Sequence, residues 1–441
     1  MPSRRTFMTR LAGAAVAAPA LNATAVRRLL AAETVAGTRS AAALADDEDY
    51  WGQVQRAFDA DRTVTNLNNG GVSPAPSHVL EAMIRDLRFS NEIPVEHMWG
   101  VLEPRIEVIR RELALDFGCD PEELAIVRNA SEANETMILG LDLAKGDEII
   151  VTTQNYPRML TTWEQRERRD GIVLKRITAP VNASDAEIVR RYREAITPRT
   201  KAIEVMHISF LTGQIFPVAE IVRLGREKGI PVFVDGAHAY AHFPFTRDSL
   251  GCDYYGTSLH KWSDYYGTSL HKWLHAPIGT GFLYVRRERI PGLWPLMGAD
   301  KSQDANIRKY EEIGTHPAAN HNAIGLALAF HRSIGAERKW RRLRWLTQRW
   351  ATPLRQQSAR VKLHTPIDDD RSGAIALVQV EGLDTGKLRE WLWGRHRIFT
   401  VLIKHPDFEG LRVTPSIYTT RDEVDRFAEL MGLAARKGLS A

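Results

Sequence analysis

The sequence of 441 residues predicts an α/β protein: a mostly parallel sheet sandwiched by helices, with a smaller α+β domain at the C-terminal end. Two observations support this fold class. Short apolar runs alternate with segments of helical periodicity over about 150 residues, a pattern typical of parallel strands joined by crossover helices. The chain is also longer than one hydrophobic core usually supports, which indicates two domains.

The expected elements follow one another in a regular order. We predict strands at residues 124–127, 148–152, 201–207 and 231–235, and helices at residues 79–88, 104–117, 186–195 and 218–228. Gly118 and Gly229 stand where two of these helices should end, because glycine readily adopts the left-handed conformation of a helix C-terminus. Residues 51–319 should form the larger domain, whose N-terminal segment packs on the smaller one. Residues 320–441 should form the smaller domain, ending in a helix at 421–436.

Polar residues stand just after several predicted strands. Residues 129–134 form a small polar loop that opens a helix and could present backbone N–H groups and a hydroxyl to an anion. Tyr156 could stack on a flat ring. Asp235 ends a very apolar strand, where a buried carboxylate needs a partner, and His238 lies three residues further on. Because parallel sheets bind ligands at the carboxyl ends of their strands, we expect the site at this edge.

A duplicated segment supplies the most informative residue type. The ten residues DYYGTSLHKW at 253–262 recur unchanged at 264–273, with only Ser263 between the copies. Each copy ends in Ser-x-His-Lys. A lysine at the end of a buried strand can bond covalently to an aldehyde cofactor while its neighbours hold a phosphate. The two candidates are Lys261 and Lys272.

The flanking sequence favours Lys272. Lys261 lies 26 residues after Asp235 and Lys272 lies 37 after it, and the shorter gap favours Lys261; the GTGFLYV that follows at 279–285 favours Lys272. If Lys272 is used, the eleven extra residues precede the strand, at the end that faces away from the site, where a longer loop costs little. We therefore predict Lys272, with Lys261 as the alternative. A third possibility is that the duplication weakens or abolishes folding.

The motifs VDGAHA (234–239), TSLHKW (268–273) and GTGFLYV together resemble the class V aminotransferases of the type-I pyridoxal-phosphate fold. This group also contains cysteine desulfurases, isopenicillin N epimerases and related lyases. The resemblance runs from about residue 66 to about residue 434. It implies a sheet of the seven-stranded type, the cofactor pyridoxal 5′-phosphate, an amino acid as the small-molecule substrate, and a homodimer with shared active sites.

The resemblance also implies a role for each matching position. Ala130, Ser131, Ser269 and His271 would bind the cofactor phosphate, Tyr156 would stack on the pyridine ring, Asp235 would pair with the ring nitrogen, His238 would lie near the phenolic oxygen, and Lys272 (alternatively Lys261) would be the covalent attachment. Thr315 would reach across the dimer to the partner's phosphate, and Arg412 would pair with the substrate α-carboxylate. Tyr156 stands where many members have histidine, and Phe210 stands where some have a polar residue.

The implied reaction begins with removal of a Cα proton from an amino acid. It would be completed as an aminotransferase or as an epimerase of the isopenicillin N epimerase type. The alternatives are a C–S or β-lyase, and a cofactor-fold protein impaired by the duplication. Desulfurase chemistry needs a cysteine on the loop before Arg412, but residues 399–410 contain none, and Cys119 and Cys252 lie elsewhere. The two cysteines have no C-x-x-C spacing, so we predict no metal site.

The N-terminal residues resemble an export signal. Residues 1–25 contain Arg4 and Arg5 in a pattern similar to the twin-arginine motif, then an apolar stretch and a small-residue cleavage site at 23–25. We therefore expect a periplasmic or exported protein, followed by a poorly ordered linker at 26–50. The apolar stretch is too short for a stable membrane anchor.

Charge gives little reason to expect a nucleic-acid partner. Three arginines and no acid lie in residues 1–25, so their removal lowers the net charge from +5 to +2 (5 − 3), a weak field. The segment 338–350 does interleave arginine with tryptophan, which could bind a single strand. We instead predict an amphipathic helix with Trp340, Leu343, Thr347 and Trp350 on one side and its arginines in solvent.

Overall fold

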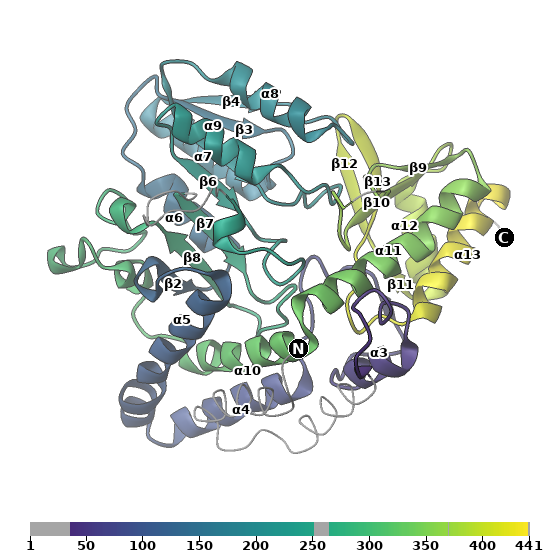
Figure 1. The fold of residues 1–441 in the computed structure, drawn as a ribbon, viewed down its shortest axis with the longest axis horizontal. Coiled ribbons are helices and arrows are strands. Elements are labelled where there is room, and N and C mark those ends of the chain that lie inside the picture. Colours follow the sequence, from purple (N-terminus) through teal and green to yellow (C-terminus); the bar gives the residue numbers. More distant parts are fainter. Residues whose placement is uncertain (1–35, 251–263, 369, 440–441) are drawn as a thin grey trace.

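The larger lobe is built on a seven-stranded sheet (Figure 1). The computed structural model describes residues 36–250, 264–368 and 370–439. The strand order is β2 (Leu124–Val127), β8 (Gly281–Val285), β7 (Tyr265–Ser269), β6 (Val232–Asp235), β5 (Thr200–Met206), β3 (Glu148–Thr152) and β4 (Val173–Ile177). β8 alone runs opposite to the other six strands, so the predicted mostly parallel sheet of seven strands is confirmed.

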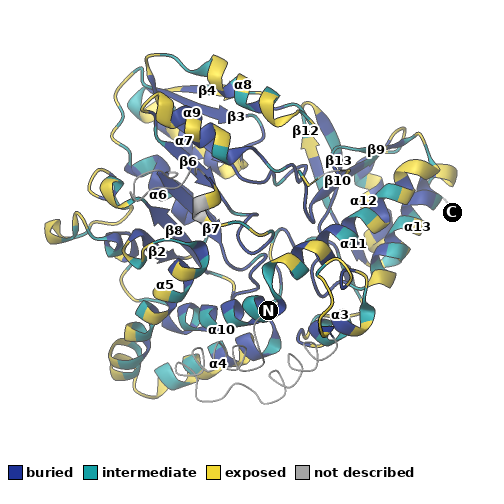
Figure 2. Ribbon diagram, viewed as in Figure 1, coloured by how far each residue is buried: buried dark blue, intermediate teal, exposed yellow. Residues whose placement is uncertain are grey.

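Helices cover both faces of this sheet, and the strands alternate their side chains between two apolar cores. In β3, Ile149 and Val151 belong to one core and Ile150 to the other. The first core lies under α6 (Ala130–Gly140) and α7 (Pro157–Asp170). The second lies under α5 (Glu103–Phe117), α8 (Asp185–Ala195), α9 (Val218–Glu227) and α10 (Ala318–Ile334), with α4 (Ser77–Glu92) packed on α10. Figure 2 shows buried strands beneath helices that expose one side.

The smaller lobe has its own antiparallel sheet and its own core. The strand order is β12 (Val401–His405), β13 (Phe408–Val413), β10 (Ala376–Val380) and β9 (Val361–Leu363). The helices α11 (Ala336–Gln357), α12 (Thr385–His396) and α13 (Arg421–Lys437) pack on it around Trp350 and Phe427. The strand β1 (Thr65–Asn66) pairs with β11 (Ile398–Phe399), and Leu67 joins this core, so an N-terminal segment belongs to the smaller lobe.

Part of the stretch that we expected to be a poorly ordered linker is packed. Of residues 26–50, the structure describes 36–50, in which Ala36 and Leu44 are fully buried. Asp47 caps α3 (Glu48–Gln55), and the Trp51 indole N–H donates to the Leu44 carbonyl at 2.7 Å. These apolar contacts hold the described part of the stretch against the larger core.

The basic segment forms α11, in which Trp340, Leu343, Thr347 and Trp350 are buried as predicted. The expectation that its arginines face solvent is wrong for Arg342 and Arg344, whose exposed fractions are 0% and 9%. Arg342 forms an ion pair with Glu48 at 2.6 Å and lies over the ring of Trp51. The reason is that the α3 segment covers this part of α11, so the buried guanidinium finds its partner there.

Two further features concern the part of the chain that the structure describes. None of its helices combines the length and hydropathy that a bilayer crossing needs. The same residues contain no group of three or more histidine, cysteine or acidic side chains arranged to hold a metal ion.

Candidate active site

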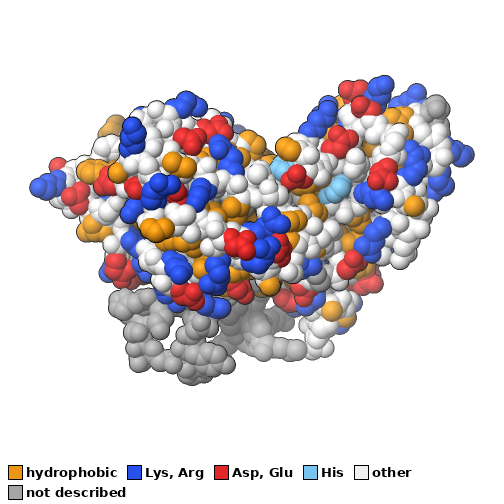
Figure 3. Space-filling view, turned by 90° about the horizontal axis from the view of Figure 1, so that it is seen from above, with side chains coloured by type: hydrophobic (Ala, Val, Ile, Leu, Met, Phe, Trp, Pro, Cys, Tyr) orange, Lys and Arg blue, Asp and Glu red, His pale blue; other side chains and the backbone are white. Residues whose placement is uncertain are grey.

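Several of the predicted site residues lie at the carboxyl ends of β6 and β7. Figure 3 shows a notch between the two lobes of the molecule. In the sheet register, Asp235 pairs with Gly267, so the ends of the two strands lie side by side. Lys272 follows β7 by three residues, and its amine interacts electrostatically with Asp235. The second copy of the repeat therefore forms the strand. The first copy, with Lys261, lies outside the described residues.

Asp235 is a buried acid whose surroundings fit a cationic ligand. It accepts a hydrogen bond from the Ala237 N–H at 3.0 Å. Burial raises its pKa, while the Ala237 N–H and the Lys272 amine lower it. Across the described ranges, no basic side chain lies within 4.0 Å of the carboxylate. A protonated pyridine nitrogen is a partner of the kind that a buried carboxylate requires.

The surroundings of Lys272 favour the neutral form of its amine more than water does. Burial lowers the pKa of its amine to about 8; Asp235 raises this pKa, and Arg412 lowers it further. A larger share of the amine is therefore neutral near pH 8 than in an exposed lysine, and the neutral form is the nucleophile. Burial lowers the pKa of His238 and of His271, and the positive charge of protonated Lys272 lowers both further. These groups thus share one small volume.

The N-terminus of α6 brings together three of the residues predicted to bind a phosphate, Ala130, Ser131 and Ser269. Asn129 caps the helix, because its side chain accepts from the Glu132 N–H at 2.9 Å. Ala130 and Ser131 are the first helical residues, and the Ala130 N–H donates to the Ser269 hydroxyl at 3.0 Å. Since a helix N-terminus favours anions, Ala130, Ser131 and Ser269 form a site that fits a phosphate. His271 lies beside them in the chain, and its Nδ1 is 3.1 Å from the Thr280 carbonyl.

Close packing of α6 on β7 depends on Gly267. A Cβ at this position would lie 2.3 Å from Asn134 Oδ1 and 2.8 Å from the Ala133 methyl group. Any larger residue would therefore push the helix away from the strand that leads to Lys272. The Asn134 side chain also hydrogen-bonds to Asp235, which lowers the pKa of that acid. Asn134 was missed as a contact, although it belongs to the predicted polar loop at 129–134.

Arg412 reaches the site from β13 of the smaller lobe. Its guanidinium donates to the Phe210 carbonyl at 3.0 Å and to Asn68 Oδ1 at 2.9 Å. Burial lowers its pKa to about 10. No carboxylate of the described chain lies within 4.0 Å of this guanidinium, so its charge is free to pair with a substrate carboxylate. Asn68 could not be inferred from the sequence, because it lies 344 positions from Arg412.

Tyr156 and Thr315 are the two accessible members of the predicted set. Tyr156 stands at the start of α7, is 43% exposed, and meets Phe210 edge-on, with ring centroids 5.3 Å apart. Its exposed ring leaves a face on which a cofactor could stack. Thr315 is exposed in the segment before α10, directly after Gly314, whose φ is 80°. Among the described residues, no hydrogen bond joins Thr315 to the residues around Lys272.

A second buried acid was missed from the sequence. Glu204, in β5, is only 3% exposed, and the Trp163 indole N–H donates to its carboxylate. Burial raises its pKa to about 7, and the charge of Asp235 raises it as well. The signal was present in the sequence: one acid lies within the apolar run 202–206, and such a residue needs a buried partner.

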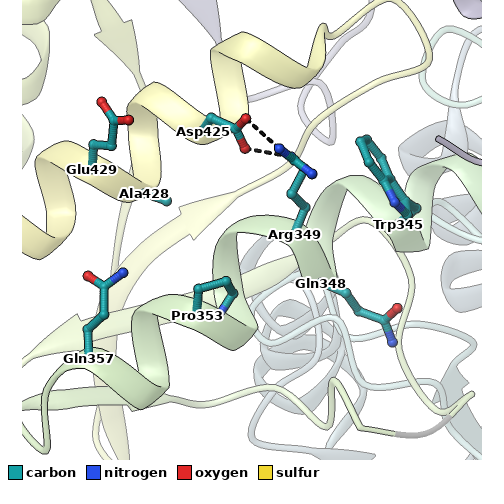
Figure 4. A pocket seen from close by; sticks show the side chains of 8 residues that line it. All are labelled: Trp345, Gln348, Arg349, Pro353, Gln357, Asp425, Ala428 and Glu429. Carbon is teal, nitrogen blue, oxygen red and sulfur yellow. Dashed lines mark hydrogen bonds and ion pairs between the residues drawn. The ribbon is translucent and has the colours of Figure 1, made fainter. Parts of the chain in front are cut away.

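A separate hollow lies between α11 and α13 on the smaller lobe (Figure 4). Arg349 and Asp425 cross it as a two-pronged ion pair of 2.6 and 2.7 Å. Trp345 and Glu429 are among its other lining residues. It contains none of the predicted site residues, and its main charges neutralise each other. We therefore place the chemistry at the strand ends.

The fold and the residues at these strand ends define an enzyme that depends on pyridoxal 5′-phosphate. The chain belongs to the aminotransferase class-V family, whose model matches residues 65–427. The isopenicillin N epimerase of Amycolatopsis lactamdurans is 30% identical over 402 residues, covering 86% of this chain and 98% of that protein. A probable cysteine desulfurase of Synechocystis sp. is 26% identical over 287 residues, covering 62% and 65%.

Solved structures share the fold. A cysteine desulfurase from Thermococcus onnurineus superimposes with a TM-score of 0.74 at 20% identity, covering 87% of this chain and 98% of that one. The cystine C–S lyase C-DES, in complex with cysteine persulfide, has a TM-score of 0.72 at 21% identity, covering 85% and 98%. At this level of identity, the likeness shows the architecture alone.

Proposed function

We propose that the protein removes the Cα proton of an amino-acid substrate with the Lys272 amine and then returns a proton to Cα, as an amino-acid epimerase does. Transamination is the second outcome, with the proton returned to the cofactor. The observation that carries the proposal is the position of the Lys272 amine, which lies close enough to the buried acid Asp235 and to Arg412 for both charges to shift its pKa. An amine with a pKa of about 8 can accept a proton near neutral pH.

The residues of this chain would divide the work as follows. Pyridoxal 5′-phosphate supplies an aldehyde that bonds to amines and a ring that draws electrons from Cα. The N-terminus of α6 with Ser269 would hold its phosphate, and Asp235 would keep its ring nitrogen protonated. Arg412 would fix the substrate carboxylate, so that the Cα–H bond points toward Lys272. Lys272 would then move the proton.

Two observations favour epimerisation over sulfur chemistry. The isopenicillin N epimerases of two actinomycetes match the chain at 29–30% identity over almost their whole length. The residues before Arg412 form the β12–β13 hairpin and contain no cysteine, while Cys119 follows α5. A C–S or β-lyase that needs no nucleophilic cysteine is the alternative reaction, and a protein impaired by its duplication is the non-catalytic alternative.

The test is proton exchange at Cα. The purified holoprotein is incubated with a panel of L- and D-amino acids in D₂O, and loss of the Cα–H signal is followed by NMR. We expect exchange with at least one substrate, and none with the Lys272→Ala variant. Chiral chromatography then identifies epimerisation, a 2-oxo acid identifies transamination, and sulfide or pyruvate identifies elimination. A loaded protein that exchanges no Cα proton would refute the proposal.

We also propose that the chain works as a homodimer. Thr315 is exposed, and apolar side chains cluster where α4 meets the helical turn Glu96–Leu102: Ile93, Val95 and Trp99 are 56%, 62% and 52% exposed. An apolar patch of this kind favours a protein interface. Sedimentation should give twice the monomer mass, and Trp99→Glu should shift it toward monomer. A wild-type protein that sediments as a monomer would exclude shared sites.

Export remains a proposal that concerns residues outside the described part of the chain. Arg4 and Arg5 precede an apolar stretch and a small-residue site at 23–25. A reporter fused after residue 30 should reach the periplasm, and replacement of both arginines by lysine should block this. A reporter that stays in the cytoplasm with either sequence would count against a signal peptide.

A further inference from the structure

The turn that carries Lys272 has an unusual backbone. The Leu270 N–H donates to the Thr280 carbonyl at 2.9 Å, and the Ala276 N–H donates to the Leu270 carbonyl at 3.1 Å. Within this turn, His275 has a φ of 63°, in the left-handed region that residues with side chains rarely adopt. Such a conformation persists only where surrounding contacts fix it.

One of the fixing contacts comes from a buried lysine on α11. The Lys339 amine donates to the carbonyl of Trp273, the residue directly after Lys272. Lys339 is 1% exposed, and within the described residues no carboxylate lies within ion-pair distance of its amine. An amine buried without a counter-ion is costly to keep. A favourable interaction must offset this free-energy cost, and the structure shows one, the hydrogen bond to the Trp273 carbonyl.

The Trp273 side chain is fixed as well. Its ring stacks on His242, with centroids 3.8 Å apart and planes 17° apart. The Ala374 N–H donates to His242 Nε2 at 2.8 Å, so the imidazole proton lies on Nδ1, which donates to the His238 carbonyl at 2.8 Å. Trp273 is thus held at its carbonyl by Lys339 and at its ring by His242. Through its two ring nitrogens, His242 also links the backbone of Ala374 to the backbone of His238.

We propose that Lys339 is a positioning residue for Lys272: its hydrogen bond to the Trp273 carbonyl fixes the turn so that the Lys272 amine faces Asp235. This inference rests on the proposed function, because it takes Lys272 as the attachment residue. Lys339 itself touches neither cofactor nor substrate. It acts through the backbone of the residue next to Lys272.

The charged surroundings of Lys339 agree with this role. The groups that face it are His242 and His275 from the larger lobe, His331 on α10, and Asp116 on α5. Burial lowers the pKa of Lys339 to about 7, opposed by Asp116, and it lowers the pKa of His242 and of His331 to about 3. The neutral and charged forms of the amine both carry N–H groups, so the hydrogen bond survives across neutral pH.

Lys309 offers a matched control. It is also buried, at 4% exposure, and its amine donates to the carbonyls of Ile290 and Asp304 at 2.6 and 2.9 Å, away from the site. Lys339→Met and Lys309→Met each remove a buried amine while keeping most of the side-chain volume. Lys339→Gln keeps a shorter donor and serves as the rescue variant and as a second route if the methionine variant does not fold.

Two measurements test the role of Lys339, after thermal unfolding has shown that each variant is folded. The first is the pH dependence of acetylation of Lys272 in the cofactor-free protein, followed by peptide mass spectrometry. The second is the rate at which added pyridoxal 5′-phosphate becomes trapped on Lys272 by borohydride. Lys339→Met should move the Lys272 labelling profile to higher pH and slow trapping on the order of tenfold. Lys339→Gln should have a smaller effect, and Lys309→Met none.

Failure of this inference is distinguishable from failure of the proposed function. A folded Lys339→Met protein with the labelling profile and trapping rate of the wild type would overturn the positioning role. The same holds if Lys309→Met produces an equal change, since the effect would then reflect general loss of a buried amine. Absence of any trapped cofactor on Lys272 in the wild type would instead refute the proposed function, while the labelling profiles still test the turn.

Discussion

Replacement of Lys272 by alanine should remove nearly all covalently attached pyridoxal 5′-phosphate, whereas Lys261→Ala should leave attachment unchanged. The reason is geometric: Lys272 follows β7, whose end lies beside Asp235 in the sheet register. The measurements are the visible absorbance band of the purified protein and, after borohydride reduction, the peptide that carries the cofactor mass. Cα-proton exchange by the Lys272→Ala variant should fall below the detection limit of the NMR assay.

A deletion controls for this assignment. Removal of residues 253–263 leaves the strand, its lysine and the following GTGFLYV intact, so the shortened protein should fold and bind the cofactor at Lys272. The opposite labelling pattern in the two alanine variants would assign the attachment to Lys261. Loss of soluble protein on deletion would show that the first copy is structurally required.

Replacement of Asp235 by asparagine should lower Cα-proton exchange by about 10²–10³-fold, the usual effect of losing one charge-stabilising contact in an active site. The cause is loss of the negative charge that would keep the cofactor ring nitrogen protonated. Loss of the Cα–H signal in D₂O, followed by NMR, measures the rate, and borohydride trapping should show that Lys272 still binds the cofactor. An exchange rate within threefold of the wild type would exclude this role for Asp235.

The stability of the cofactor-free Asp235→Asn protein separates catalysis from folding. Burial raises the pKa of Asp235 in the folded state above its unfolded value of 3.8. The folded state therefore binds the proton more tightly, and the stability that this group contributes is lost as pH rises through the folded pKa. Asparagine carries no such charge, so the variant should be at least as stable as the wild type at pH 8. A large fall in its unfolding temperature would indicate a structural role.

Local sequence was enough to predict the central strands and the residues at their ends. The strands β2, β3 and β6 are short, wholly buried apolar runs, and their bounds match the prediction to within one residue. Chain order then places Asp235 and Lys272 at one edge, because parallel strands share a direction. The predicted helices at 104–117 and 186–195 likewise begin within one residue of α5 and α8.

Elements with weak apolar periodicity were missed. The helix α7 ends in the charged run Glu164–Asp170, and it packs through a few residues such as Met159 and Trp163. The strand β4 is an edge strand with exposed positions, so it lacks a continuous apolar signal. Neither pattern stands out from a polar loop in one sequence.

Contacts between distant parts of the chain were also beyond local reasoning. Arg342 is buried because Glu48, almost 300 residues earlier, pairs with it. Arg412 is oriented by Asn68 and by the Phe210 carbonyl, which belong to other segments. These partners depend on how the lobes pack, and a single sequence does not encode that packing in any short pattern.

Because the two copies are identical, either one would make the same contacts as the strand β7. In one arrangement, residues 265–269 occupy the place of β7, as in the structure; in the other, the first copy would take that place, shifted by eleven residues. Their difference in free energy comes from the flanking chain alone. The ratio of cofactor trapped on Lys261 to that on Lys272 would measure it, with each tenfold preference equal to about 1.4 kcal/mol. The repeat thus allows the free energy of placing eleven extra residues before or after a catalytic strand to be compared within one molecule.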